Sequence, residues 1–483
     1  MCARSTTRRL RRTRPSSILS WRRVIRRRMA STIRPTSRRA ARLGTFPSVL
    51  EKERVRHGHT WRLSKRLEQM RHLARALAHR NYALYFSAQI LSQAGTHMQQ
   101  VAMSWLVFRL TGSTFMLGFV AFMGQFPTLI FGPFVGLLAD RVERRKVLFW
   151  TQFASLVHSV ALAVLTAGSE IRAEVLVIMW LLLGLINAID QPVRQALIAE
   201  LVPRREDLPN AVALTSVTIH SSRLIGPALG GVLIAQWGES ACFLMNAASY
   251  SFVLAALCAI RLQERPAHKP GQSVIGALSE GFGYTLEHRY ILLLLSIVAM
   301  ISFFSTPYIS LLPYFAKEVY GGDAQSFGFM TAAAGAGAFS GTLFLAGRRT
   351  VFDIDRTIVA AVLASGFALA LFARTDQVPL AVAALFVIGF CSINIVAASN
   401  VLIQSVVADR MRGRVMGLFT MAFFGISPIG SLAIGSAGQS FGVRDTLTCC
   451  AAVIMLTGIV AARLRKNIPH EALVTEHCSA QPS

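Results

Sequence analysis

Long apolar runs alternate with short charged intervals along this chain, and the alternation repeats twelve times after residue 80. A run of about 18 or more apolar residues predicts a membrane-spanning helix, because the bilayer core holds no water that could satisfy a non-helical backbone. The pattern therefore predicts an all-α membrane protein. Its twelve spans are expected at residues 84–108, 114–138, 147–167, 175–198, 212–235, 240–260, 290–313, 327–346, 357–373, 378–401, 415–436 and 444–462.

Basic residues are concentrated in every second loop, which indicates how the spans are oriented. Loops rich in Lys and Arg stay on the cytoplasmic side of a membrane. The even number of spans then places both termini in the cytoplasm. The basic loops carry Arg141, Arg144, Arg145 and Lys146; Arg204 and Arg205; Arg261, Arg265, Lys269 and Arg289; Arg348, Arg349 and Arg356; and Arg410, Arg412 and Arg414.

The longest internal loop, residues 261–289, divides the spans into two groups of six at residues 81–260 and 290–462. It begins as a linker rich in Pro and charge, and its second part has one apolar stripe that predicts a helix at the cytoplasmic interface. Residues 463–483 are expected to form a cytoplasmic tail. The two groups also resemble each other weakly, since QALIAELVPRR precedes IGPALGG in the first and NVLIQSVVADRMRGR precedes ISPIGSLAIG in the second. Such internal repeats are typical of secondary transporters.

The formal net charge of +26 belongs mainly to the start of the chain. Residues 1–80 hold 24 of the 50 Lys and Arg residues and only three acids, so the remainder is nearly balanced. The basicity therefore predicts no nucleic-acid partner. This first segment cannot build a core and is expected to be disordered. It is either an organellar transit peptide or an over-extended reading frame that precedes a true start near Met70.

Residues that could support catalysis or bind a metal are not grouped in this sequence. The seven cysteines form no Cys-x-x-Cys pair, and most lie inside apolar runs. There is no phosphate-binding G-x-x-x-x-G-K-[ST] loop and no nucleophile beside a base. We therefore expect no metal, no cofactor and no enzyme activity.

Ionisable residues inside the spans are the first candidates for function, because a charge there needs a partner or a polar cavity. Asp190 is the only acid well inside a predicted span, and it can pair with Arg194 one turn away or with Arg223 at a similar depth. Its carboxylate could carry a proton during transport, or the pair could simply hold two helices in register. Polar faces on the first and fourth spans predict a cavity lining, or else hydrogen bonds between helices: Gln89, Gln93, His97, Gln100, Asn187 and Gln191.

The stretch GLLADRVERRK carries dense charge between the second and third spans. By itself it could do no more than fix the topology. Its spacing, G-x-L-a-D-R-x-x-R-R-x-x-L, resembles the loop signature of the major facilitator superfamily, although Glu143 stands where that signature has a second glycine. The resemblance implies two six-helix halves held by a cytoplasmic latch that contains Gly136, Asp140, Arg141, Arg144 and Arg145.

Two further stretches resemble the same superfamily. The segment IGPALGG in the fifth span is similar to the glycine-proline motif of major facilitator antiporters. The run NAIDQPVRQALIAELVPRREDLPNAVALTS is similar to the branch that contains the enterobactin exporter, macrolide-efflux proteins and transmembrane secretion effectors. The resemblance covers residues 81–462 and implies a monomeric transporter in the bacterial plasma membrane. The residues on the antiporter motif are Gly226, Pro227, Gly230 and Gly231.

The sequence therefore predicts a secondary active transporter that exports a siderophore- or drug-like small molecule by alternating access, with proton antiport as its energy source. An importer or a lysophospholipid flippase of the same fold remains open, because one cavity can serve either direction. A membrane receptor or scaffold that does not transport is the alternative from a different class.

Overall fold

The computed structural model describes residues 75–138, 143–168, 171–260, 274–347 and 354–466, and these residues form helices and no strand. Ten of the helices are long and apolar enough to span a membrane. One of the ten, α7, contains both the fifth and the sixth span, so the ten helices hold eleven spans. The more polar α3 is the twelfth. The prediction of an all-α protein with twelve spans is thus confirmed.

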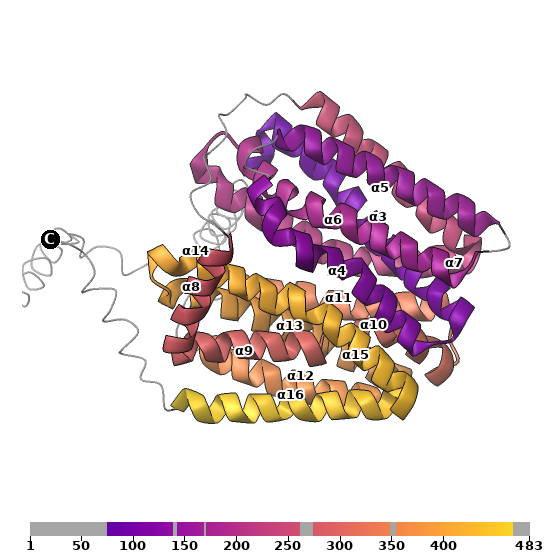
Figure 1. Ribbon diagram of the computed structural model, residues 1–483. Helices are drawn as coiled ribbons and strands as arrows, with labels where there is room; N and C mark the ends of the chain where they lie inside the picture. The colour runs from indigo at the N-terminus through magenta and orange to yellow at the C-terminus, as the bar shows by residue number, and fades with distance from the viewer. Residues whose placement is uncertain (1–74, 139–142, 169–170, 261–273, 348–353, 467–483) are drawn as a thin grey trace, which may run out of the picture. The chain divides into compact units, whose positions relative to one another are not determined.

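The first half contains five long helices (Figure 1). The last of them changes direction at Gly238, whose φ of 76° lies in a region that glycine adopts readily and other residues rarely do. This break separates the fifth span from the sixth. The helices are α3 (Arg80–Thr111), α4 (Thr114–Leu138), α5 (Arg144–Ala167), α6 (Ala173–Leu201) and α7 (Leu208–Ala259), with short 3-10 turns η1 (Arg75–Ala78) and η2 (Arg205–Asp207).

A short helix, α8 (Val274–Glu287), precedes the second half and contacts α14 through an ion pair between Glu280 and Arg414. The spans of the second half are α9 (Arg289–Phe304), α10 (Tyr308–Tyr314) with the π-helical turn η3 (Phe315–Val319), α11 (Ala324–Ala346), α12 (Ile354–Arg374), α13 (Val378–Val406), α14 (Asp409–Thr420) with the π-helical turn η4 (Met421–Gly425) and α15 (Ile426–Phe441), and α16 (Val443–Lys466).

The seventh span is discontinuous near its middle. α9 ends at Phe304, the backbone N–H of Thr306 donates to Ile301 O at 3.0 Å, and α10 begins after Pro307. Proline has no backbone N–H and cannot continue the helical ladder, which explains the break. The span then continues through η3 to Val319, six residues beyond the predicted end.

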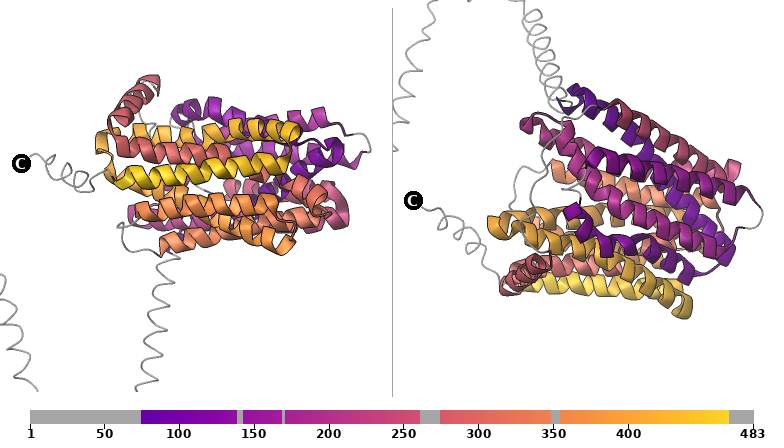
Figure 2. Two further views of the ribbon diagram at one scale, coloured as in Figure 1. Left: turned by 90° about the horizontal axis from the view of Figure 1, so that it is seen from below. Right: turned by 45° about the horizontal axis from the view of Figure 1, so that its top comes forward.

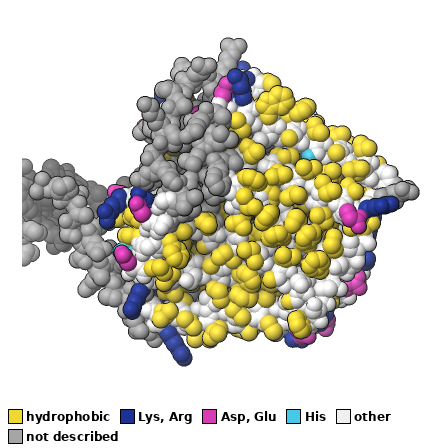
Figure 3. Space-filling view, viewed as in Figure 1, with side chains coloured by type: hydrophobic (Ala, Val, Ile, Leu, Met, Phe, Trp, Pro, Cys, Tyr) yellow, Lys and Arg dark blue, Asp and Glu magenta, His cyan; other side chains and the backbone are white. Residues whose placement is uncertain are grey.

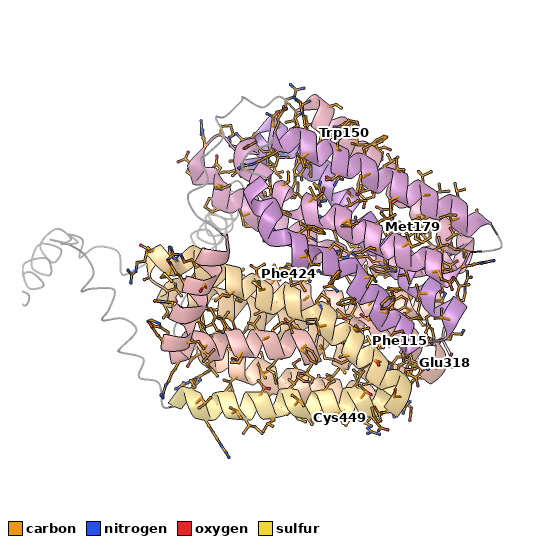
Figure 4. The ribbon with its side chains drawn as sticks, viewed as in Figure 1. Phe115, Trp150, Met179, Glu318, Phe424 and Cys449 are labelled. Atoms are coloured by element: carbon orange, nitrogen blue, oxygen red, sulfur yellow. The ribbon has the colours of Figure 1, made fainter. Side chains whose placement is uncertain are left out.

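Large apolar side chains cover the outer surface of the helices (Figure 3). Trp150 on α5 is 64% exposed and lies on the outer side of that helix (Figure 4), and Phe367 on α12 is 66% exposed. Charged side chains gather near the helix ends in the same view (Figure 3). A soluble protein rarely exposes so much apolar surface, so this face is suited to lipid.

The helices of the first half lie mostly above those of the second in Figure 1, and the right view of Figure 2 shows the same two groups. α4 packs against α15, and α7 packs against α11. The hydrogen bonds between described residues of the two halves lie at one end, where the Thr114 N–H and the Ser113 hydroxyl donate to Gln439 Oε1 at 3.0 and 3.1 Å. Phe115 and Glu318 lie at this same end, away from α8 and α14 (Figure 4).

Candidate functional site

Asp190 lies inside the first half and is 1% exposed. Its Oδ1 accepts hydrogen bonds from Thr151 Oγ1 and Gln152 Nε2 on α5, both at 2.7 Å. Its Oδ2 forms an ion pair with Arg194, one turn further along α6. Of the two pairings that the sequence allowed, the structure therefore has Asp190 with Arg194 and not with Arg223. Three partners satisfy the carboxylate, which is what a charge at this depth requires.

Arg194 extends this cluster to α3, because its NH1 donates to Gln89 Oε1 at 2.9 Å. Four buried polar atoms around the ion pair have no hydrogen-bond partner among the described residues: Tyr85 Oη, Gln89 Nε2, Gln152 Oε1 and Arg194 Nε. Unpaired buried polar atoms cost free energy, on the order of 1–3 kcal/mol each. The cluster is thus held by one ion pair, and some of its hydrogen-bonding capacity is unused among the described residues.

Arg223 lies in a different environment, at the middle of the first segment of α7. Fifteen residues separate it from Leu208 and fifteen from Gly238, about 22 Å on each side at helical rise. Its side chain is exposed, and the side chains of His97, His220 and Tyr308 lie near it. Within the part of the chain that the structure describes, no ion pair involves Arg223.

The residues predicted to line a cavity lie in different surroundings. Gln89 is buried against Arg194, whereas His97 Nδ1 shares a hydrogen bond of 3.1 Å with Gln100 Oε1 near Arg223. Gln93 and Asn187 are half-buried, and Gln191 is exposed. The polar face of α3 therefore serves two neighbourhoods, the Asp190 cluster and the surroundings of Arg223.

The glycine-proline motif is a place where α7 packs very closely on other helices. Gly226 lies against α3, where a Cβ would be 2.8 Å from His97 Cβ. On another side Gly231 meets Gly328 of α11, where a Cβ on Gly328 would be 2.7 Å from Gly231 Cα. Only glycine allows backbones to approach this closely. The motif thus joins α7 both to its own half and to the second half.

The loop stretch is described only in part. Asp140 and Arg141 lie outside the described residues, and for Gly136 the structure gives no more than its place near the end of α4. Arg144 NH1 donates to Glu200 Oε1 at 2.8 Å, and Arg145 Nε donates to Leu257 O at 2.8 Å. These bonds attach the start of α5 to α6 and α7 within the first half. The latch role of the stretch stays a prediction.

Sequence reasoning missed several buried polar residues. It did not single out Thr151 and Gln152, although they lie one to two turns before His158 on a polar face of the third span. It also missed Gln99, whose Oε1 accepts from Ser159 Oγ at 2.6 Å and Asn246 Nδ2 at 2.7 Å. The recurrence of polar residues at 151, 155, 158 and 159 was the available indication.

No group of three His, Cys, Asp or Glu side chains among the described residues is arranged to hold a metal ion. The site consists instead of one buried ion pair and one unpaired cation within a bundle of apolar helices. Two groups of six spans with charged side chains away from the helix ends are typical of secondary membrane transporters.

Comparison with known proteins identifies the family. The profile of the transmembrane secretion effector family matches residues 73–481, and the chain belongs to this family of major facilitator transporters. It is 26% identical over 368 residues to the staphyloferrin A transporter of Staphylococcus aureus, a match that covers 75% of this chain and 91% of that one. It is 24% identical to the multidrug efflux pump Tap of Mycolicibacterium fortuitum, with 79% and 95% covered.

Solved structures support the fold. The nucleoside transporter NupG superimposes with a TM-score of 0.64 and 13% identity, covering 80% of this chain and 99% of that one. A bacterial homolog of the human lysosomal transporter Spinster, in an inward-facing unoccupied conformation, gives a TM-score of 0.63 and 13% identity, with 80% and 96% covered. The chain is thus a multi-pass major facilitator transporter of a small molecule, and, as expected, its relatives are transporters and not enzymes.

Proposed function

We propose that this transporter exports a siderophore- or drug-like small molecule from a bacterial cell by alternating access, and that proton entry drives the export. The names of its relatives support the substrate class and the direction, since they include a staphyloferrin A transporter and multidrug efflux pumps. The positive loops support a plasma-membrane protein with both termini in the cytoplasm. It works as a monomer.

The observation that carries the proton-coupling proposal is the environment of Asp190. Among the described spans of this chain, it is the one acid buried far from a helix end, and its partners come from two helices, α5 and α6. A proton on this carboxylate removes its attraction for Arg194. Arg194 then has lost the charge of its counterion, whereas its bond to Gln89 of α3 is unchanged.

Proton occupancy of Asp190 therefore changes how α6 is held against α3 and α5. The unpaired atoms of Tyr85, Gln89 and Gln152 can accept or donate the bonds that the ion pair gives up. A two-state arrangement of this kind can link a proton to a rearrangement of helices, provided that water reaches the carboxylate in one of the states. The latch stretch would act on the same equilibrium from the cytoplasmic ends of the helices.

The test is transport into inverted membrane vesicles with an acidic interior, using a siderophore, a cationic dye and a lysophospholipid as a panel. We expect the wild type to accumulate at least one of them only while the pH gradient is present. Asp190→Asn keeps an oxygen that accepts from Thr151 and Gln152 but removes the negative charge, so it should lose the gradient-dependent accumulation by tenfold or more.

Glu174→Gln is the matched control, because Glu174 is an exposed acid in the first turn of the same helix, α6, and belongs neither to the Asp190 cluster nor to the latch stretch. It should keep the gradient dependence. A folded Asp190→Asn protein with unchanged gradient dependence would exclude the proton role of Asp190. Accumulation by the wild type that ignores the gradient would exclude proton coupling, and no movement of any panel member would favour a receptor.

A further inference from the structure

Arg223 is a cation in the middle of the bundle with no acidic partner in the described part of the chain. It is not involved in the proton-coupling cluster, because Asp190 is already satisfied by Arg194, Thr151 and Gln152. A guanidinium held between membrane helices is unfavourable unless an anion or water compensates its charge. Its side chain is exposed and not covered by the protein, so it is open to contact with such a partner.

The groups near Arg223 can all donate hydrogen bonds. His97 comes from α3, His220 lies one turn before Arg223 on α7, and Tyr308 is the first residue of α10. His220 Nδ1 is buried without a hydrogen-bond partner among the described residues. A neutral imidazole donates from one nitrogen and accepts at the other, and a phenol donates as well. The neighbourhood is therefore rich in donors and carries one permanent positive charge.

The surroundings of Arg223 are built by both halves. The backbone of Arg223 lies directly against α11, since a Cβ on Gly335 would be 2.6 Å from Arg223 C. Tyr308 begins the second part of the discontinuous seventh span, immediately after the break at residues 305–307. Helices broken near the middle of the membrane are the usual place for substrate binding in secondary transporters. A ligand here would contact residues of both halves and sense their movement.

We propose that Arg223, together with His97, His220 and Tyr308, binds an anionic group of the transported molecule, which is a carboxylate or a phosphate. Arginine suits this role because its planar fork matches both groups with two parallel hydrogen bonds. The proposal rests on the transport function proposed above and specifies its substrate class. The two proposals assign different sites to the two ligands: Asp190 binds the coupling proton, and Arg223 binds the substrate.

The test is equilibrium binding to the purified full-length protein in detergent, measured by isothermal titration calorimetry without any gradient. The probes are citrate for carboxylates, lysophosphatidylglycerol for phosphate headgroups and ethidium as a cation. We expect at least one anionic probe to bind the wild type, and Arg223→Gln to weaken that binding on the order of 10- to 100-fold, as the loss of a charged hydrogen-bond donor does. Arg223→Lys should lie in between.

Arg374→Gln is the control, because it removes the same charge from an exposed ion pair with Asp445 outside this site, and it should leave the affinity unchanged. Binding of citrate that depends on Arg223 identifies a carboxylate substrate, and binding of lysophosphatidylglycerol that depends on it identifies a phosphate lipid. The proposal is wrong if neither anionic probe binds the wild type. It is also wrong if Arg223→Gln and Arg223→Lys bind the anionic probe as tightly as the wild type does. Because no gradient is present, this result is independent of whether Asp190 couples protons.

Discussion

Asp190 and Arg223 both place a charge deep in the first half, but their surroundings differ. Asp190 is 1% exposed and has three hydrogen-bonding partners, one of them the cation of Arg194. Arg223 is exposed and lies among His97, His220 and Tyr308, without an acid beside it in the described structure. The charge of Asp190 is balanced by Arg194 within the protein. The charge of Arg223 has no such partner among the described residues, and we propose that the substrate supplies it.

The second half is different again. In the spans described for residues 289–466, charged side chains lie near helix ends, as Lys317 and Glu318 do in η3. The middle of that half contributes small residues, Tyr308 and the break in the seventh span. In the proposed mechanism the second half therefore contributes a packing surface and the hydroxyl of Tyr308 as a hydrogen-bond donor. The ionised groups of the mechanism lie in the first half.

Replacing Arg194 is expected to have the largest effect on the difference between the two charged sites. Arg194→Met leaves the buried Asp190 without its counterion, and losing one member of a buried ion pair typically costs about 3–5 kcal/mol. We expect a large fall in the midpoint of thermal unfolding in detergent, monitored by intrinsic fluorescence. Arg374→Met should change stability by less than about 1 kcal/mol, because its pair with Asp445 is exposed. Equal effects of the two substitutions would contradict the assignment of a buried pair.

The same substitution at Arg223 should have a much smaller effect. Arg223→Met removes a cation that has no acidic partner among the described residues. We therefore expect the free energy of unfolding to fall by less than about 1 kcal/mol, or to rise. The measurement is the same fluorescence melt, run beside the wild type without ligand. A fall as large as that of Arg194→Met would mean that Arg223 is a structural residue, and it would remove the basis of the anion-binding proposal.

The number and order of the helices could be predicted from the sequence because each span is a long apolar run, and such runs leave the backbone few alternatives in a membrane. Their ends could not, since α3 begins at Arg80 and α13 continues to Val406, where helices extend into the polar interface. The break in the seventh span was also missed. Pro307 indicated it, but a single proline is tolerated in many membrane helices.

The candidate site was harder to predict than the fold. Depth along a helix follows from residue number, and in the structure Asp190 and Arg223 both lie more than ten residues from the ends of their helical segments. The direction of a side chain depends on how neighbouring helices are rotated, which no single sequence fixes. For this reason both arginines were possible partners of Asp190, and the contribution of Thr151 on α5 became visible only in the structure.

The most direct test of the separation between proton coupling and substrate binding compares two modes of transport in proteoliposomes containing Asp190→Asn. Counterflow exchanges labelled for unlabelled substrate without a net proton movement, whereas accumulation against a gradient needs the proton. With the panel member that the wild type transports, we expect counterflow within about threefold of the wild type and no gradient-driven accumulation. Loss of both modes together, or full gradient-driven accumulation, would contradict the claim that Asp190 carries the coupling proton.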